Sequence, residues 1–250
     1  MSPRALDQHS LKQRELEIIE AALRLLEQVD VSQLTMDKVV AQVPYSKGTV
    51  YSHFSGKEDL LAAIGNYAMQ TMADLFGRAA ASEGNSRERY LGMSFAYLVY
   101  ALLKPTLFRV ALCSKSPSVI GKTSPERLTE HERLETTLMG LFFEVIDAGI
   151  AEGSLQLPPH LNKQQISFLG WAGGYGAIML LNDDLNQCGG RHGLYLEREY
   201  YNASNIFMDG LGWQPLSSEY DYRQVINALM EGRFAAEIEE IRQRGRQLVF

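Results

Sequence analysis

Residues 35–61 read TMDKVVAQVPYSKGTVYSHFSGKEDLL and carry local signals for two short helices and the start of a longer one. Thr35 and Ser46 are residue types that cap helix N-termini, and an apolar pattern follows each of them. Pro44 ends the first helix, because proline cannot continue one. The third helix is expected to begin at residue 55 or 56. Two short helices joined by a tight turn and followed by a long helix match the geometry of a helix-turn-helix.

The second short helix, residues 47–53, has side chains suited to the major groove of DNA. Gly48 removes bulk where the backbone approaches the bases, and Thr49 offers a hydroxyl and a methyl group. Lys47 can reach guanine acceptors or a phosphate. These three residues are therefore candidates for reading sequence.

Three further side chains around this helix favour phosphate contacts, which fix register without reading sequence. Tyr51 and His53 can donate to phosphate oxygens, and Lys57 adds a charge to the free amides of a helix start. The complete set of predicted DNA-binding residues is Thr35, Ser46, Lys47, Gly48, Thr49, Tyr51, His53 and Lys57.

This pattern resembles the N-terminal signature of the TetR family of bacterial regulators. In that signature a Ser-x-Gly-Thr-hydrophobic-Tyr recognition helix precedes a His-Phe pair and Lys-Glu-x-Leu. The matching residues are Ser46, Gly48, Thr49, Val50, Tyr51, His53, Phe54, Lys57, Glu58 and Leu60. The resemblance covers about residues 12–65. It implies a homodimeric transcriptional regulator, by default a repressor, that binds a near-palindromic operator and is released by a small-molecule effector.

One part of the turn departs from the family pattern. Family members commonly place Ala-Gly-Val before the serine, whereas this chain has Val43-Pro44-Tyr45. Proline cannot adopt the positive φ that a turn glycine often takes, so a somewhat different turn is expected.

Helical periodicity outside this segment predicts an all-α fold. A first helix is expected from Ser10, with Gln13 completing a capping box, to about Val29. We expect a helix-turn-helix domain at residues 1–56 and a larger helical effector-binding and dimerisation domain at 57–250. The helices expected beyond residue 80 span about 90–103, 107–113, 124–152, 163–181, 194–211 and 221–247, the last as an extra amphipathic helix.

The larger domain is expected to hold both the dimer interface and the effector pocket. Glycines inside an apolar helix cost about 1 kcal/mol each unless close packing compensates. They therefore favour a helix contact across a dimer axis at Gly170, Gly173, Gly174 and Ala177, with contact to another helix of the same subunit as the alternative. Aromatic and methionine side chains favour an apolar or aromatic effector. The candidate pocket residues are Phe95, Tyr100, Phe108, Met139, Phe142, Phe143, Trp171, Tyr175 and Met179.

The composition sets limits on the function. The net charge of −6 argues against a general nucleic-acid coat, and residues 1–60 hold seven Lys and Arg against nine Asp and Glu. Cys113 and Cys188 fit no metal-ligand spacing, so no metal or cofactor is expected. No segment approaches the ~20 apolar residues of a membrane span, and a cytoplasmic protein without a membrane partner is expected.

Two other classes of function stay open at this stage. The acidic charge and Pro44 are compatible with a helical interaction protein that has lost DNA binding. An enzyme is disfavoured, because the chain has no nucleophile elbow, phosphate loop or paired histidine ligands, and no catalytic residue is assigned.

Overall fold

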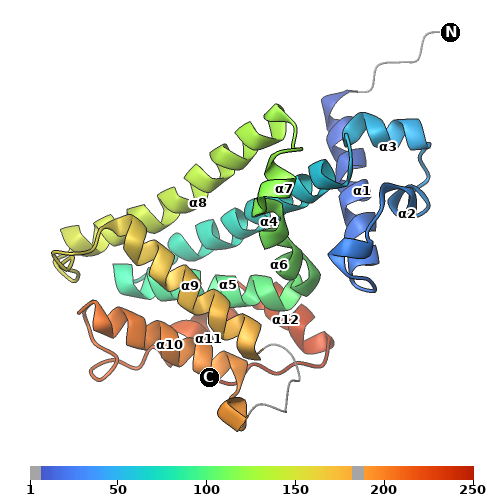
Figure 1. Ribbon diagram of the computed structural model, residues 1–250. Coiled ribbons are helices and arrows are strands. Elements are labelled where there is room, and N and C mark those ends of the chain that lie inside the picture. The colour runs from blue at the N-terminus through green and yellow to red at the C-terminus, as the bar shows by residue number, and fades with distance from the viewer. Residues whose placement is uncertain (1–6, 182–188) are drawn as a thin grey trace. The chain divides into compact units, whose positions relative to one another are not determined.

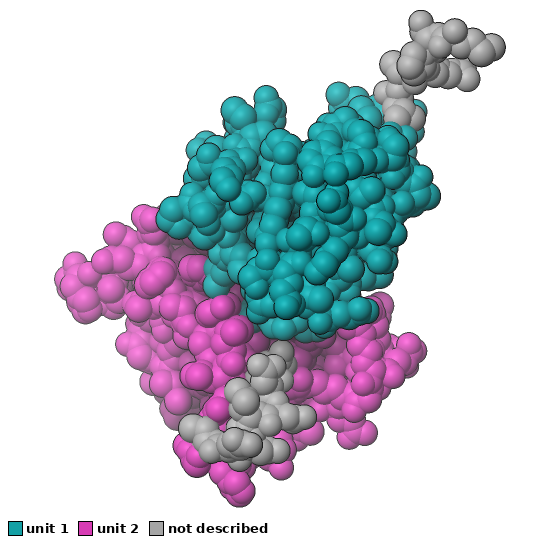
Figure 2. Space-filling model, turned by 45° about the vertical axis from the view of Figure 1, so that its right-hand side comes forward, with its two compact units in different colours: residues 1–69, 105–134 teal, residues 70–104, 135–250 magenta. Residues whose placement is uncertain are grey.

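The computed structural model describes residues 7–181 and 189–250, which form helices and turns without a strand. The all-α fold class is confirmed for these residues. The chain divides into two compact units, which are unit 1 (residues 1–69 and 105–134) and unit 2 (residues 70–104 and 135–250) (Figure 2). The expected domain boundary at residue 56 stays a prediction. Residues 182–188, which include Cys188 and much of the loop expected at 182–193, lie outside the described residues.

Unit 1 contains the N-terminal helices and a segment from the middle of the chain (Figure 1). Two 3₁₀ helices, Val31–Gln33 and Leu112–Lys115, connect its α-helices. The α-helices are α1 (Gln8–Leu26), α2 (Met36–Val40), α3 (Lys47–His53), the first part of α4 (Lys57–Ala80), α6 (Pro105–Ala111), α7 (Pro117–Ile120) and the first part of α8 (Pro125–Ala151).

The start of α1 differs from the sequence prediction. Asp7 is the N-cap, and its carboxylate accepts a hydrogen bond of 2.7 Å from the Ser10 amide. The predicted capping box at Ser10 is therefore wrong, because the stronger acidic acceptor lies three residues earlier. The helix then buries the face that the periodicity indicated, including Ile18, Ala22 and Leu26.

The core of unit 1 joins α1, α2, α3 and α4 through apolar side chains. Val39, Val50 and Phe54 are fully buried, whereas Val43 in the turn is half-buried. Burial of each such side chain contributes about 1.5–3 kcal/mol to stability. Gly65 of α4 lies so close to the second 3₁₀ helix that an added Cβ would be 2.2 Å from the Ser114 hydroxyl. These contacts leave one face of α3 outside the core.

Unit 2 is built around α5 (Ser86–Leu103), whose side chains are nearly all buried. An Asn85–Glu88 capping box fixes its start. The helices that pack on α5 are α9 (Lys163–Leu181), α10 (Leu196–Gly210), α11 (Arg223–Glu231) and α12 (Ala235–Gln243). The unit also holds the second parts of α4 and α8 and a short 3₁₀ helix, Gly189–Arg191. The bounds of α9 are those that the sequence predicted.

The C-terminal segment forms two helices where the sequence suggested one over about 221–247. Helix α11 ends at Glu231 with Gly232 as its C-cap, and the chain resumes as α12 after Phe234. The Phe234 ring is fully buried and packs edge-on against Phe95 at 5.9 Å, while the Arg78 guanidinium lies 4.8 Å from its centre. In a continuous helix the helical repeat would fix the direction of the Phe234 side chain. The break after Glu231 allows Phe234 to enter the core of unit 2.

Arg87 of α5 is fully buried in unit 2. It donates to the Trp213 and Pro215 carbonyls, and its Nη2 lies 2.5 Å from Asp209 Oδ1. The guanidinium lies 4.5 Å from the centre of the Tyr222 ring. Arg87 therefore joins the start of α5 to the chain that follows α10.

Among the described helices, no single one is long and apolar enough to cross a membrane. Helix α5 taken together with residues 105–115 meets that test by length and composition, but only across a sharp bend.

Candidate nucleic-acid interface

The two helix starts of the predicted helix-turn-helix are confirmed. Thr35 caps α2, and its hydroxyl accepts from the Lys38 amide at 3.3 Å. Ser46 caps α3, where its hydroxyl accepts from the Thr49 amide at 3.1 Å. The Thr49 hydroxyl lies 2.9 Å from the same oxygen. Both caps satisfy amides that would otherwise have no partner, so α2 and α3 are defined although each is very short.

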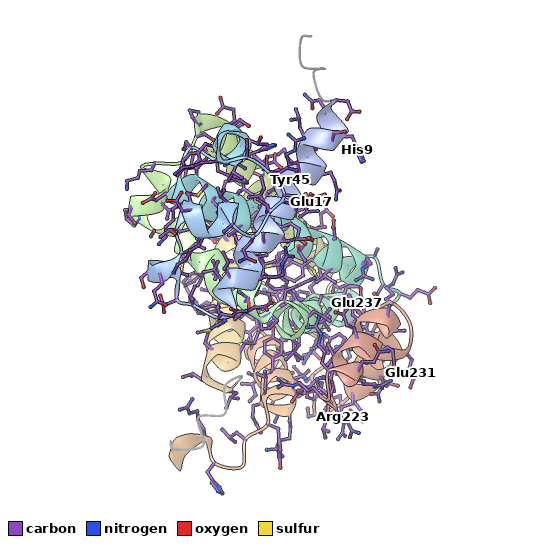
Figure 3. All side chains as sticks on the ribbon, turned by 90° about the vertical axis from the view of Figure 1, so that its right-hand side faces the viewer. His9, Glu17, Tyr45, Arg223, Glu231 and Glu237 are labelled. Carbon is purple, nitrogen blue, oxygen red and sulfur yellow. The ribbon has the colours of Figure 1, made fainter. Side chains whose placement is uncertain are left out.

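The turn that carries Pro44 is anchored on α1. The Tyr45 hydroxyl donates to the Glu17 carboxylate, and Figure 3 shows these two side chains side by side. The Arg14 guanidinium lies 4.9 Å from the centre of the Tyr45 ring. The hydrogen bond to Glu17 raises the pKa of Tyr45. No described residue other than glycine has a positive φ, so this turn forms without a residue in the left-handed region.

Helix α3 presents different side chains on its two faces. Val50 is buried against the core, whereas Lys47, Gly48 and Tyr51 are exposed and Thr49 is half-buried. An added Cβ at Gly48 would meet only the Ser46 hydroxyl, at 3.8 Å. The exposed face thus combines a cation, a hydroxyl, a phenol and a position without a side chain.

Lys47 has an intramolecular partner on this face. Its Nζ lies 2.7 Å from Asp37 Oδ1 of α2 and 5.6 Å from the centre of the Tyr51 ring. The hydrogen bond and the charge of Asp37 raise the pKa of Lys47. Both partners of the ion pair are well exposed, so the pair is weak and can exchange with another anion.

Two other predicted phosphate-binding residues, His53 and Lys57, lie in more enclosed positions. The Lys57 ammonium donates to the Val31 carbonyl at 2.5 Å and to the Ser32 carbonyl at 3.2 Å. The His53 side chain is only 7% exposed, and its Nδ1 lies 3.9 Å from Glu15 Oε2. Both groups thus point toward other residues of unit 1.

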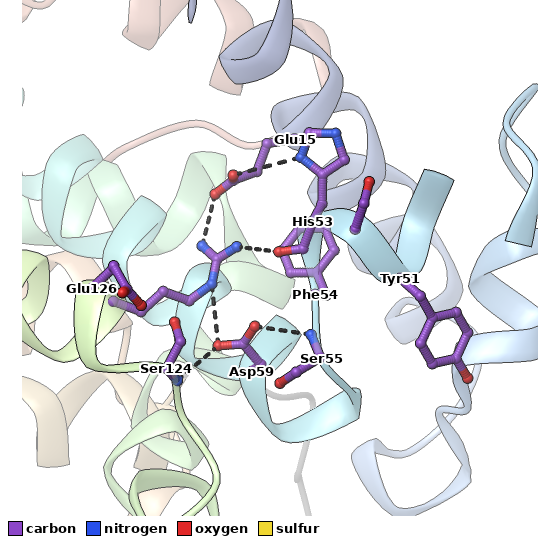
Figure 4. Close-up of a pocket in the computed structure, with 10 residues that line it drawn as sticks. Glu15, Tyr51, His53, Phe54, Ser55, Asp59, Ser124 and Glu126 are labelled. Carbon is purple, nitrogen blue, oxygen red and sulfur yellow. Dashed lines mark hydrogen bonds and ion pairs between the residues drawn. The ribbon is translucent and has the colours of Figure 1, made fainter. Parts of the chain in front are cut away.

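A cleft of about 440 Å³ lies beside the C-terminal end of α3, within unit 1 (Figure 4). Burial lowers the pKa of His53 in its wall, and the charges of Arg14 and Arg127 act in the same direction, against the opposing effect of Glu15. Arg127 of α8 contacts Glu15, His53 and Asp59, which are labelled in Figure 4. The sequence prediction included neither Arg127 nor its partners Glu15 and Asp59.

The predicted effector-pocket residues are distributed over both units. Phe108 is buried in α6 of unit 1, whereas the others belong to unit 2. Phe95 is covered by Phe234 and Phe250, and Met179 is exposed. Phe142 and Tyr100 belong to an aromatic cluster of unit 2 that also contains Phe76, Tyr90 and Tyr97.

Trp171 and Tyr175 lie at one edge of this aromatic cluster. The Trp171 indole donates to the Tyr97 hydroxyl at 3.0 Å, and the Trp171 and Tyr175 ring centres are 6.5 Å apart. Met139 and Phe143 are half-buried on α8, where the Lys163 ammonium lies 5.4 Å from the centre of the Phe143 ring. Six of the nine candidates thus have aromatic or cation contacts within unit 2, namely Phe95, Tyr100, Phe142, Phe143, Trp171 and Tyr175.

The glycines of α9 have two different environments. An added Cβ at Gly170 would lie 2.7 Å from the Tyr90 hydroxyl, and one at Gly174 would lie 3.0 Å from the Tyr200 hydroxyl. An added Cβ at Gly173 would meet no atom within 4 Å, and Ala177 is half-buried. Gly170 and Gly174 therefore provide close packing inside the subunit, while Gly173 lies on an open face.

Among the described residues, no group of three or more His, Cys, Asp or Glu side chains is placed to hold a metal ion.

These features define a helix-turn-helix DNA-binding unit of a transcriptional regulator. Residues 18–64 match the family model of bacterial regulatory proteins, tetR family. This match supports a DNA-binding transcriptional regulator of the TetR family. No match was found among curated protein sequences.

Solved structures have the same fold. A tetR-family regulatory protein from Rhodococcus RHA1 is 16% identical with a TM-score of 0.61, over 80% of this chain and 98% of its own. The TetR family regulator PfmR from Thermus thermophilus is 16% identical with a TM-score of 0.58, over 78% and 98%. FadR from Bacillus subtilis, solved with stearoyl-CoA, is 14% identical with a TM-score of 0.60, over 78% and 98%.

Proposed function

We propose that the protein is a repressor that binds a near-palindromic operator as a homodimer and that a small apolar or aromatic effector releases it. The observation that supports DNA reading by α3 is the division of its faces. Val50 and Phe54 attach the helix to the core, and Lys47, Gly48 and Tyr51 are exposed. A short helix with one buried face and one exposed polar face fits the major groove.

We assign the DNA contacts of individual residues from the exposure of their side chains. We assign base contacts to Lys47, Gly48 and Thr49, and phosphate contacts to Tyr51 and the capping residues Thr35 and Ser46. His53 and Lys57, the remaining predicted contacts, would reach phosphate only after leaving Glu15 and the Val31 carbonyl.

The homodimer is supported by an apolar surface on two adjacent helices of unit 2. Leu169, Gly173 and Leu180 are exposed on α9, and Ile206 on α10 is 71% exposed. Exposed apolar side chains gathered on one surface are typical of protein interfaces. A second copy of this surface would complete a four-helix bundle and bring two recognition helices to one duplex, which needs half-sites about 34 Å apart or a multiple of this.

The effector class is supported by the aromatic cluster of unit 2. Its rings belong to α4, α5 and α8, so a bound molecule would contact several helices at once. FadR, which has the same fold, was solved with stearoyl-CoA, so long-chain acyl-CoA esters are the first probes to test. An effector releases DNA only if it binds the DNA-incompetent state more tightly.

DNA binding is tested by selecting bound fragments from random-sequence DNA and measuring their affinity at several salt concentrations. Specific binding is expected to weaken steeply with salt, because the duplex loses condensed cations on binding. Tyr51→Ala is expected to weaken binding to all sequences equally, whereas Lys47→Ala changes sequence preference. Arg24→Ala, which removes an exposed cation at the end of α1, is the control for loss of charge. Unchanged affinity of Tyr51→Ala contradicts its phosphate contact.

The dimer is tested by analytical ultracentrifugation of Ile206→Glu. A carboxylate in an apolar interface is expected to shift the protein to monomers and to lower operator affinity. Val249→Glu changes a residue of similar exposure outside α9 and α10 and should leave the dimer intact. A wild-type protein that is monomeric at working concentration contradicts the proposal.

Repression and release are tested by transcription from a promoter carrying the selected operator, with and without stearoyl-CoA. Transcription should fall with protein and recover with the ligand. If the protein raises transcription, the regulator is an activator. If no acyl-CoA ester shifts the temperature of thermal unfolding, acyl-CoA esters are excluded as effectors, because a ligand of the native state must stabilise that state.

A further inference from the structure

Arg127 lies outside residues 18–64, yet its side chain contacts α1, α3 and α4. Its Nη1 donates to Glu15 Oε1 of α1 at 2.7 Å, and its Nη2 donates to the His53 carbonyl at 2.8 Å. Its Nε lies 3.2 Å from Asp59 Oδ1 of α4. Figure 4 labels Glu15, His53 and Asp59, and its dashed lines mark these contacts. One side chain from the first turn of α8 thus meets α1, the end of α3 and the start of α4.

The contact with His53 acts on the recognition helix itself. His53 is the last residue of α3, and carbonyls in the last turn of a helix have no partner inside it. A cation at this end also interacts favourably with the helix dipole. The guanidinium lies 4.7 Å from the centre of the Phe54 ring, which follows directly. Arg127 therefore closes the C-terminal end of α3.

The contact with Asp59 fixes the corner between α3 and α4. Asp59 is buried, and its carboxylate also accepts from the amides of Ser55 and Ser124, each at 3.1 Å. Farther along, Asn66 Nδ2 donates to the Arg127 carbonyl at 3.0 Å. The start of α8 is therefore attached to α4 at both the side chain and the backbone of Arg127.

The charges around Arg127 explain how this one residue can hold α1, α3 and α4 together. The Arg127 side chain is only 14% exposed and lies between the Glu15 and Asp59 carboxylates. Without it, two negative groups and an unpaired carbonyl would face one another in a partly enclosed site. Enclosed charges without a partner are strongly unfavourable, so the three helices would move apart.

We propose that Arg127 is a positioning residue for DNA binding, which holds α3 at its angle to α1 and α4 from outside the helix-turn-helix sequence. The inference rests on the proposed DNA-reading role of α3. Helix α8 also carries Met139, Phe142 and Phe143, so a helix with three effector-candidate residues also holds the recognition helix.

The test compares Arg127→Gln and Arg127→Lys with Arg133→Gln. Arg133 lies on the same helix, is well exposed and pairs with Glu130 three residues away. The readouts are affinity for a DNA fragment selected by the wild-type protein, hydrogen exchange of the amides of residues 46–60, and exchange of residues 163–181 as a reference for unit 2.

Arg127→Gln is expected to lower DNA affinity at least tenfold and to speed exchange at Phe54 and its neighbours, with residues 163–181 unchanged. Arg127→Lys keeps one charged contact and should recover part of both losses. Arg133→Gln should match the wild type. A general loss of stability would also speed exchange in residues 163–181. A change confined to residues 46–60, with partial recovery by lysine, therefore indicates a local effect on α3.

Two results would overturn the proposal. One is a folded Arg127→Gln protein with wild-type affinity and wild-type exchange in residues 46–60. If Arg127→Gln does not fold, Arg127→Lys decides, and wild-type values for that variant overturn the proposal equally. A wild-type protein that selects no DNA contradicts the proposed function instead, and the exchange measurements still report whether Arg127 holds α3.

Discussion

Units 1 and 2 hold distant segments together in different ways. Unit 1 joins α1, α3, α4 and α8 through Arg127, which keeps some exposure beside a cleft. Unit 2 joins α5 to the chain after α10 through Arg87, which is fully buried and bound to two backbone carbonyls and the Asp209 carboxylate. A fully buried arginine has no open space beside it, whereas a partly exposed arginine beside a cleft has room to rearrange. An arginine can therefore fix the packing of helices in unit 2 and allow the helices of unit 1 to move.

The largest expected effect is that of Arg87→Met. The substitution leaves Asp209 and two carbonyls without their cation, and loss of one partner of a buried ion pair costs about 3–5 kcal/mol of unfolding free energy. Urea denaturation followed by circular dichroism measures it. Arg89→Met, two residues along and partly exposed, is the control and should lower stability much less. Equal losses for the two variants would mean that Arg87 has no special role.

Asp59→Asn tests the corresponding site of unit 1. The amide keeps one accepting oxygen but directs its NH₂ group toward Arg127 or a backbone amide, so at least one donor loses its acceptor. The expected loss of unfolding free energy is about 1–3 kcal/mol. Asp74→Asn, on an exposed part of α4, is the control in the same denaturation assay. If Asp59→Asn were as stable as that control, the polar corner would contribute nothing to unit 1.

Gly170→Ala tests how tightly unit 2 packs. Alanine gains about 1 kcal/mol of helix propensity, but its methyl group would overlap the Tyr90 hydroxyl, and overpacking of this kind costs about 1–3 kcal/mol. The net result should be a loss of about 1 kcal/mol in urea denaturation. Gly77→Ala has open space around its new methyl group and should gain stability. A gain in both variants would show that α9 can shift away from Tyr90.

The smallest effect is a dependence on pH in unit 1. The pKa of His53 is lowered in the folded state, so below its ordinary pKa of about 6.5 the unfolded chain binds more protons than the folded one. Stability is fully present above that value and falls as the pH drops toward the folded pKa. His53→Gln should reduce the difference in urea midpoint between about pH 8 and about pH 5.5, on either side of that ordinary value. The exposed His160→Gln is the control, and an identical change in both variants would locate the effect elsewhere.

Local signals in the sequence were sufficient for much of the fold and for the segment that defines the family. The caps at Thr35 and Ser46 and the bounds of α9 are confirmed, because capping and helical periodicity are properties of neighbouring residues. The contacts of individual residues with DNA stay predictions. The Asp7 cap was missed because Ser10 offers a similar signal in the same turn.

The rest depends on contacts between residues far apart in the chain. Arg127 lies more than sixty residues from its partners Asp59 and His53. No local sequence pattern indicates which residues a single arginine near a helix start will contact. The break at Gly232 depends on the place that Phe234 takes beside Phe95. Glycines in α9 indicate close packing, but the Tyr90 and Tyr200 hydroxyls that require it at Gly170 and Gly174 come from other helices.

The pairing of Lys47 with Asp37 bears on how strongly salt affects binding. A lysine that is paired with a neighbouring carboxylate already has a counter-ion. It therefore displaces fewer cations from the duplex than an unpaired lysine would. The logarithmic dependence of affinity on salt should therefore be shallower than the number of cationic side chains at the groove suggests. Neutralising Asp37 as asparagine would make that dependence steeper while leaving the fold of α2 and α3 unchanged.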